Sequence, residues 1–306
     1  MKKLRILDYY CHQGNQYEFF KTGHDFYLVS PDAQKPNWDI NDRPLPKNVS
    51  LITEQEGFKK LYDVVIVRSP INITRYTPFI RRGSIPIAVV QTTSPYPVPR
   101  EVKHVVWNCQ EAMKRSGKFY IGKQNHYIVH GFDPEQFQNL NLEKKERILT
   151  VANVFRQREK IMGYDLWRPV ADQLKICDLV GHGNEKIPES LGKATGFQDL
   201  IKYYNSYQMF LNPTRESAMP RSRGEALMCG MATVSTSGFD IKNYYTNGKD
   251  ILFADSSGEM IESIKRLQQN PNLIQDLGHQ ARETAIKNFN ISDYISKWNQ
   301  VFKSVK

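Results

Sequence analysis

The sequence has no apolar run long enough to cross a membrane. None of its segments approaches the roughly 18 consecutive apolar residues that a spanning helix needs. The first residues lead directly into a strand pattern rather than a long apolar signal segment. Because both signals are missing, we expect an intracellular protein, either cytoplasmic or peripheral to the membrane.

Cysteine and histidine are too few and too scattered to suggest a zinc site. The four cysteines show no Cys-x-x-Cys spacing, and none combines with a His in a zinc-type pattern. Internal repeats, low-complexity tracts and coiled-coil heptads are also missing. The 306 residues fit two α/β domains of about 150 residues each.

Acidic residues are scarce in one part of the chain. The net charge is +10, and between Arg68 and Lys123 ten basic residues stand against two acids, Glu101 and Glu111. Excess positive charge favours association with anionic partners but does not specify a fold. We expect this stretch to be either a solvated basic face or a surface that binds an anionic acceptor.

Short β-branched and aromatic runs alternate with amphipathic stretches, which is typical of parallel sheets flanked by helices. Several runs are continuously apolar, as strands buried on both faces are. The predicted strands span residues 4–10, 25–30, 49–53, 63–68, 85–92, 104–108, 126–129, 148–153, 176–180, 209–212, 233–236 and 251–254. The predicted helices of the second half span residues 164–174, 199–207, 222–229, 241–246, 258–269, 273–288 and 292–305.

The alternation predicts the α/β class, with two Rossmann-like parallel-sheet domains facing a cleft. We place the domains at residues 1–146 and 147–290, and a last helix at 291–306 packing back toward the first domain. Ligands of such sheets bind at the carboxyl ends of the strands, where helix N-termini favour phosphate. A nucleotide diphosphate is a natural ligand, although the architecture also serves dehydrogenases and epimerases.

The segment from Asn212 to Gly230 contains the residues best suited to bind a polyhydroxylated ligand. Glu216 follows a predicted strand, where a carboxylate can accept hydrogen bonds from hydroxyls. Glu225 lies in the following helix, where its two oxygens can accept from a ribose diol. A single Glu is more often a solvated surface group, so the interpretation depends on the pair.

This segment resembles the signature of retaining glycosyltransferases with the GT-B fold, especially family four (group 1). That signature is an acidic residue and small residues, followed by a helix carrying Glu-Ala-Met-x-x-Gly. The matching pieces are Arg215-Glu216-Ser217 and Glu225-Ala226-Leu227-Met228-Cys229-Gly230. Further pieces follow in family order at residues 129–137, 179–183, 195–204, 233–236 and 247–253.

The resemblance implies which residues hold the donor, a nucleotide-diphosphate sugar, in the second domain. Glu216 would contact the sugar hydroxyls, and Glu225 would hold the ribose. The N–H groups of Ser217 and Ala218 would meet the sugar or the phosphate. No metal and no cofactor would be required.

The resemblance also places a basic pair after the first strand of the second domain, within residues 153–160. A leaving diphosphate gains charge as the glycosidic bond breaks, and fixed cations stabilise that change. We favour Arg158 and Lys160, with Arg156 close behind, and the alternative is a charged loop facing water. Gly183, in a Gly-x-Gly turn, and Phe197 would complete the donor site.

The first domain matches the family only weakly. Gly14 would lie near the diphosphate, where glycine lets a backbone approach closely, or in an ordinary turn. Many relatives carry a His at the end of a central strand near the reacting sugar, but this chain has none there. The candidates on the acceptor side are Gln91, Thr93 and His12, although histidines in such positions are more often structural.

Two features depart from the family pattern. Glu216 and Glu225 are nine positions apart instead of the usual eight, which indicates one inserted residue near Pro220 and Arg221. Basic residues also replace the apolar ones usual at 221–223, where Arg221 and Arg223 would either meet phosphate or face solvent.

The predicted reaction is transfer of a sugar from a nucleotide sugar, with retention of configuration, to a saccharide or lipid-linked acceptor. The basic stretch also suits DNA, so a DNA glycosyltransferase acting on a hydroxymethylated base is the second hypothesis. A nucleotide-sugar epimerase or phosphorylase, and a non-catalytic nucleic-acid-binding protein, are further alternatives.

Overall fold

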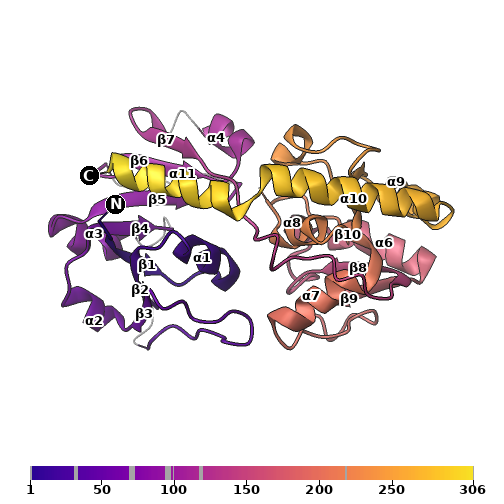
Figure 1. Ribbon diagram of the computed structural model, residues 1–306, viewed down its shortest axis with the longest axis horizontal. Coiled ribbons are helices and arrows are strands. Elements are labelled where there is room, and N and C mark those ends of the chain that lie inside the picture. Colours follow the sequence, from indigo (N-terminus) through magenta and orange to yellow (C-terminus); the bar gives the residue numbers. More distant parts are fainter. Residues whose placement is uncertain are drawn as a thin grey trace. The chain divides into compact units, whose positions relative to one another are not determined.

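A computed structural model describes residues 2–30, 34–68, 73–93, 98, 100–116, 120–217 and 219–305 of the chain. The chain divides into two compact units. Unit 1 consists of Met1–Gly131 and Ile291–Lys306, and unit 2 consists of Phe132–Asn290. Each unit contains its own sheet with flanking helices (Figure 1).

In the described residues, unit 1 is built on a seven-stranded parallel sheet with the order β3-β2-β1-β4-β5-β6-β7. Every residue of β4 and β6 is buried, as their continuous apolar runs predict. The strands are β1 (Arg5–Tyr9), β2 (Asp25–Val29), β3 (Val49–Ile52), β4 (Val64–Val67), β5 (Ile85–Val90), β6 (His104–Trp107) and β7 (Gln124–Tyr127).

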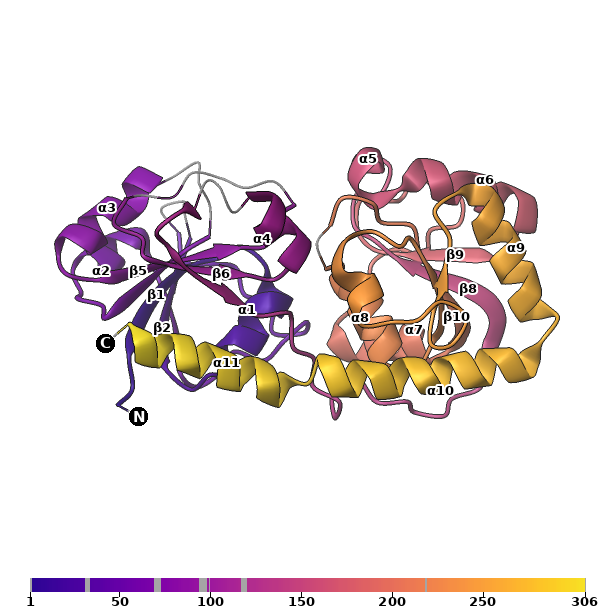
Figure 2. The same cartoon turned by 90° about the horizontal axis from the view of Figure 1, so that it is seen from above.

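The last helix of the chain, α11 (Ile291–Ser304), packs on the core of unit 1 (Figure 2). Its Trp298 ring meets Phe19 edge-on at 4.5 Å between centroids, and its Phe302 ring is 4.8 Å from His24. The sequence therefore returns to unit 1 after completing unit 2. The other helices of unit 1 are α1 (Gln13–Phe20), α2 (Glu54–Phe58), α3 (Ile73–Arg81) and α4 (Gln110–Ser116).

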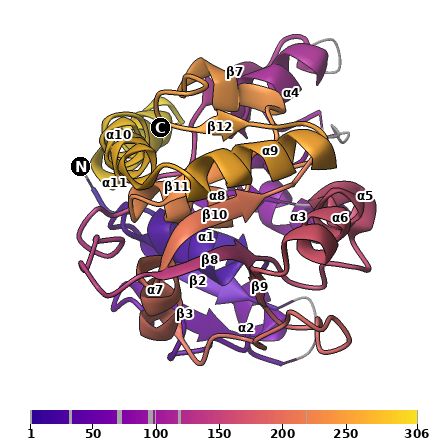
Figure 3. The ribbon, with the colours of Figure 1, turned by 90° about the vertical axis from the view of Figure 1, so that its right-hand side faces the viewer.

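Unit 2 contains, within the described residues, a five-stranded parallel sheet in the order β12-β11-β10-β8-β9, which Figure 3 shows side by side. The strands are β8 (Lys145–Val151), β9 (Cys177–Val180), β10 (Tyr207–Asn212), β11 (Ala232–Ser235) and β12 (Leu252–Phe253). All strands predicted from the sequence are present, with ends displaced by at most three residues. The shifts are largest where polar residues extend a strand beyond its apolar run, as at Lys145.

The helices of unit 2 follow the amphipathic pattern of the sequence. They are α5 (Glu159–Met162), α6 (Tyr164–Leu174), α7 (Phe197–Asn205), α8 (Arg221–Met228), α9 (Ser257–Gln268) and α10 (Pro271–Asn288). The start of α9 is a capping box, because Ser256 accepts from the Glu259 N–H while the Glu259 carboxylate accepts from the Ser256 N–H. The helix predicted at 241–246 is instead a 3₁₀-helix, η2 (Phe239–Asn243).

The division between the units falls at Gly131, not at residue 146. The residues between these points belong to unit 2, since the Asn205 amide donates to the Gln138 carbonyl at 3.0 Å and accepts from the Leu140 N–H at 2.6 Å. Phe137 is buried and meets Phe197 edge-on at 5.4 Å. The charged stretch at 143–147 therefore includes the first three residues of β8 and is not a domain boundary.

Hydropathy along the helices gives no membrane segment. Among the described residues, none of the helices combines the length and the apolar character that crossing a bilayer requires.

Candidate functional site

The candidate donor site lies at the carboxyl edge of the unit 2 sheet. The strand order reverses direction there, because β9 lies on one side of β8 while β10, β11 and β12 lie on the other. The loops after β8 and β10 therefore adjoin at a switch point, the usual ligand position in parallel sheets. The predicted donor segments at 153–160 and 213–220 follow these two strands.

A buried asparagine joins the loops after β8 and β9. The Asn184 side chain accepts from the Phe155 N–H at 2.9 Å and donates to the carbonyls of Ala152 and Gly181 at 2.7 and 3.1 Å. At Gly181 a Cβ would lie 2.0 Å from the Ala152 oxygen, so only glycine fits. The Gly183 carbonyl accepts from the Gln157 side chain at 3.4 Å, which places the Gly-x-Gly turn beside the predicted basic segment.

The loop after β10 is anchored through its backbone to α5 and packs against the turn between α5 and α6. The N–H groups of Arg215 and Glu216 both donate to the Ile161 carbonyl, at 2.9 and 3.1 Å. In that turn Gly163 has φ of +75°, and a Cβ there would lie 2.0 Å from the Pro213 oxygen. This close approach places Glu216 next to Ile161. Ile161 directly follows Lys160 in the sequence.

An ion pair reinforces the same contact. The Arg215 guanidinium donates to both carboxylate oxygens of Asp165, at 2.6 and 2.8 Å. The hydrogen bond from Arg215 lowers the pKa of Asp165 below its usual range. The pair therefore holds the residue before Glu216 in place without using the Glu216 carboxylate.

The predicted catalytic charges remain available to a ligand. Glu216, Arg156, Arg158 and Lys160 are all exposed. In the part of the chain that the structure describes, none of these four side chains makes a hydrogen bond or an ion pair. Within the described residues, one unpaired carboxylate and three unpaired cations thus lie on the adjoining segments that follow β8 and β10, at the carboxyl edge of the sheet.

Glu225 is in a different state from Glu216. It lies in α8, is 5% exposed, and both of its carboxylate oxygens have protein partners. Arg221 Nε donates to Oε1 at 2.7 Å, and the Tyr204 hydroxyl donates to Oε2 at 2.9 Å. The sequence identified the acid but missed both of its partners.

The comparison with protein families applies to this half of the chain. Residues 156–300 match the model of a family described as "Glycosyl transferase-like". The matched segment spans just under half of the chain. The match confirms the enzyme class predicted from the sequence, a glycosyltransferase.

Solved structures extend the likeness to the whole fold. A glycosyltransferase from Rickettsia africae superposes with a TM-score of 0.75 at 12% identity, covering 100% of this chain and 99% of that one. HepE of Anabaena, in complex with UDP and glucose, has a TM-score of 0.76 at 12% identity, with 98% and 100% covered. These likenesses confirm the predicted fold class, two Rossmann-like parallel-sheet domains of the GT-B type. A search of curated protein sequences finds no significant match.

Arg221 and Arg223 were expected to meet phosphate or to face solvent, and the burial of Arg223 contradicts this expectation. Arg221 pairs with Glu225, and its guanidinium lies over the Phe132 ring at 5.3 Å. Arg223 is 2% exposed, donates to Ser235 Oγ at 3.2 Å and has no partner at Nη2 within the described residues. Burial lowers the pKa of Arg223 to about 10, since no carboxylate compensates its charge.

The other predicted donor residues of unit 2 do not all lie at the carboxyl edge of the sheet. Ser217 is half-buried in the loop after β10, and Ala218 lies outside the described residues. Phe197 begins α7 and is buried against Phe137, so its ring belongs to the core.

In unit 1, the loop expected around Gly14 is the first turn of α1. His12 is the N-cap of this helix, and its Nδ1 accepts from the Asn15 N–H at 3.3 Å. Gly14 is therefore at a helix N-terminus rather than in a glycine-rich loop. Gln91 and Thr93 follow β5 at the carboxyl edge of the unit 1 sheet and are half-buried.

A buried ion pair, missed by the sequence analysis, occupies the switch point of unit 1 between β1 and β4. Asp8 is 0% exposed and accepts from Arg68 Nε and Nη2 at 2.8 and 2.9 Å. Gln16 also donates to Asp8, at 2.9 Å, and accepts from the N–H groups of Cys11 and His12. An acid inside an apolar strand was the available signal, since a buried charge requires a partner.

In the folded protein, acidic side chains neutralise part of the positive charge of the stretch between Arg68 and Lys123. Arg68 pairs with Asp8, and Arg75 pairs with Glu54 at 3.1 Å, so two acids from outside the stretch neutralise part of it. Arg115 pairs with Glu111 inside the stretch. Lys118 lies outside the described residues.

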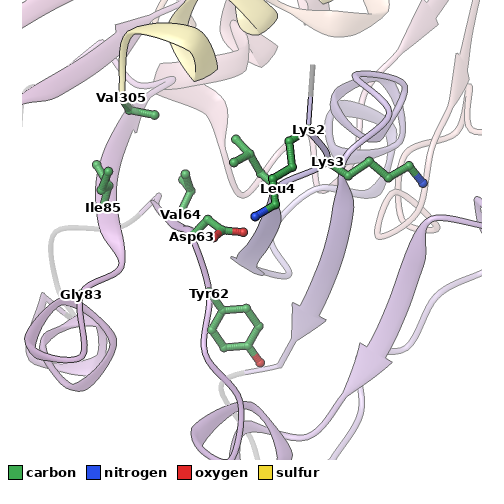
Figure 4. A pocket seen from close by; sticks show the side chains of 9 residues that line it. All are labelled: Lys2, Lys3, Leu4, Tyr62, Asp63, Val64, Gly83, Ile85 and Val305. Carbon is green, nitrogen blue, oxygen red and sulfur yellow. The ribbon is translucent and has the colours of Figure 1, made fainter.

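Unit 1 contains a cavity of about 390 Å³, and Figure 4 shows the side chains that line it. Its lining includes Leu4, Val64 and Ile85, which stand at the beginnings of β1, β4 and β5. Gln91 and Thr93 follow the opposite end of β5. No group of three or more His, Cys, Asp or Glu side chains in the described residues is placed to hold a metal ion.

Proposed function

We propose that this chain is a cytoplasmic retaining glycosyltransferase of the family-four type. It would transfer a sugar from a nucleotide-diphosphate donor to a saccharide or lipid-linked acceptor, without a required metal or cofactor. One observation carries the proposal. The backbone contact from Glu216 to Ile161 brings an unpaired carboxylate next to the segment with the unpaired cations Arg158 and Lys160.

These charges suit the two ends of a sugar diphosphate. Glu216 accepts hydrogen bonds from the hydroxyls of the sugar, which orients it without covalent attachment. Arg158 and Lys160, supported by Arg156, neutralise the diphosphate, whose charge increases as the glycosidic bond breaks. The structures of HepE in complex with UDP and with UDP-glucose support a donor of this class.

Glu225 is proposed to bind the ribose of the nucleotide. A carboxylate offers about four lone-pair sites, and Arg221 and Tyr204 occupy two directions around it. A ribose diol can therefore add its hydrogen bonds while the carboxylate keeps its position. Arg221 lies one helical turn before Glu225 in α8 and pairs with it.

The acceptor proposed first is a saccharide or a lipid-linked saccharide. Pairing of Arg68 and Arg75 with acids removes part of the positive charge that DNA would need. Glycosylation of a hydroxymethylated base is therefore the second proposal and a defined outcome of the test below.

The test is incubation of the full chain with a panel of nucleotide sugars and acceptors, including hydroxymethylated DNA, with mass spectrometry of the products. The anomeric configuration of the product is then determined by NMR. Glu216→Gln keeps the shape and removes the charge, and we expect turnover to fall about 100-fold. Glu143→Gln, an exposed acid preceding β8, serves as the control with unchanged turnover.

Several results would contradict the proposal. Wild-type turnover in Glu216→Gln would remove the site assignment. Donor conversion without any acceptor would indicate an epimerase, and dependence on free phosphate would indicate a phosphorylase. Inversion of the anomeric centre would reject the retaining mechanism.

A further inference from the structure

A second cavity in unit 2 lies at the amino edge of the sheet. It measures about 460 Å³, and its lining includes Lys144, Gln208, Gly230, Gly278, His279 and Arg282. Lys144 immediately precedes β8, Gln208 lies near the start of β10, and Gly230 precedes β11. The residues from Pro271 to Arg282 come from α10. The donor segments follow the opposite ends of β8 and β10.

The charges of this cavity have one sign. Its lining contains Lys144, Arg282 and His279 and, among the described residues, no Asp or Glu. His279 approaches Glu283 at 3.8 Å in an exposed pair, but neither Lys144 nor Arg282 has a carboxylate partner in the described chain. Two cations of the wall are thus not neutralised by the protein.

Both of these cations are partly removed from water. Burial is the main cause that lowers the pKa of Lys144, and burial also lowers the pKa of Arg282. The Arg282 guanidinium is held rigidly, because it donates to the backbone carbonyls of Phe137, Met228 and Pro134. Lys144 makes no hydrogen bond in the described residues. A desolvated cation without a counter-charge is costly, and an anion in the cavity would offset that cost.

We propose that this cavity binds a small phosphate-bearing molecule, at a site separate from the donor site. Lys144 and Arg282 meet the phosphate group. A volume of about 460 Å³ falls in the range of small-molecule sites. The side-chain amides of Asn139, Gln208 and Gln275 provide hydrogen-bond donors and acceptors for a polar body attached to the phosphate.

Two glycines of the cavity lining bring α10 into backbone contact with the turn before β11. Gly278 in α10 packs so closely on Gly230 that a Cβ at Gly278 would lie 2.3 Å from the Gly230 oxygen. Gly230 itself has φ of +76°. Glycine at both positions therefore allows α10 to pack directly against the turn before β11, next to the cavity.

The cavity of unit 1 lacks this charge imbalance. Its lining in Figure 4 includes Lys2 and Lys3 but also Asp63. Lys3 pairs with Asp25 at 3.2 Å, and Asp63 accepts from the Arg5 N–H at 2.7 Å. Most charged side chains of this lining have an oppositely charged or hydrogen-bonding partner within the protein. An anion bound there would therefore offset a smaller desolvation cost.

Isothermal titration calorimetry on the full chain tests the proposal, with inorganic phosphate, glucose 6-phosphate and UDP as separate probes. We expect phosphate or the sugar phosphate to bind, and Lys144→Met to weaken that binding at least tenfold. Lys287→Met removes the same charge from an exposed position of α10 outside the cavity and should leave the affinity unchanged. Tighter binding of glucose 6-phosphate than of phosphate identifies a phosphorylated metabolite, and equal affinity identifies free phosphate.

Absence of binding by both phosphate probes at millimolar concentration would overturn the inference, and so would equal affinity of Lys144→Met and wild type. Displacement of the bound phosphate by UDP, or loss of its binding in Arg158→Met, would also overturn it, because either result would place the phosphate in the donor site. Loss of sugar transfer in Glu216→Gln tests the proposed function and does not bear on phosphate binding in this cavity.

Discussion

Tyr204 in α7 donates its phenolic hydrogen to Glu225 in α8 at 2.9 Å, with both residues buried. Burial, reinforced by the charge of Glu225, raises the pKa of the Tyr204 phenol far above its usual range, so the hydroxyl stays protonated as a donor. The carboxylate proposed to hold the ribose is therefore positioned by the fold before any ligand arrives.

Removing this donor should destabilise the domain. In Tyr204→Phe the Glu225 oxygen Oε2 loses its partner inside the protein, and we expect the free energy of unfolding to fall by about 1–3 kcal/mol. Urea denaturation followed by circular dichroism measures it. Tyr203→Phe, at the neighbouring half-buried position, should change it by less than about 0.5 kcal/mol. Equal effects of the two substitutions would show that the hydrogen bond is not the cause.

Reversing the charge of Arg215 should lower turnover but leave the stability of the protein almost unchanged. Both side chains are more than a third exposed, so the pair contributes at most about 1 kcal/mol to stability. It nevertheless orients the residue before Glu216, and we expect Arg215→Asp to lower turnover about tenfold with little change in melting temperature. Adding Asp165→Arg should restore most of the turnover. Failure of the double variant to recover would argue against this positioning role.

Alanine at Gly163 should be far worse than alanine at Gly192. Both glycines have positive φ, +75° and +80°, which costs an alanine about 1–2 kcal/mol. Only at Gly163 does the added Cβ also collide with a backbone oxygen, that of Pro213, while nothing lies within 4 Å at Gly192. We expect Gly163→Ala to lose a further 1–3 kcal/mol or so of unfolding free energy, measured by urea denaturation. Similar losses in both variants would contradict the close packing of the two loops.

Stability should fall on mild acidification because of two histidines of unit 1. His104 Nδ1 lies 3.3 Å from His126 Nε2, and burial lowers the pKa of both below the ordinary value. The nearby charge of Lys103 lowers the pKa of His104 further, and His104 does the same to His126. The unfolded chain then binds protons at a higher pH than the folded one, so the free energy of unfolding decreases as the pH drops below about 6.5.

Thermal unfolding between pH 7.5 and pH 5 measures this effect. The melting temperature of His126→Gln should depend less on pH than that of the wild type. The exposed His279 provides the control, and His279→Gln should keep the wild-type slope. Equal slopes in all three proteins would show that the histidine pair does not contribute.

Local patterns predicted much of the fold because burial and backbone geometry act over short stretches of sequence. The run Val64–Val67 is apolar at every position, and it is a strand buried throughout. The helix at Tyr164–Leu174 has the predicted limits, with Gly163 preceding it and Lys175 ending it in the left-handed conformation. The domain boundary was less predictable, since the contacts of Asn205 with Gln138 and Leu140 span more than 60 residues.

For the candidate site, the sequence by itself determined which residue types are present and which strand each one follows. Glu216 and the basic segment were found in this way, because loops after parallel strands meet at one edge of the sheet. Tertiary structure alone decided which charges are available. Arg68 is neutralised by Asp8, and Arg223 is buried without a carboxylate partner, whereas Glu216, Arg158 and Lys160 remain unpaired in the described chain. The physical reason is that ion pairing and desolvation depend on distances between side chains that are remote in sequence.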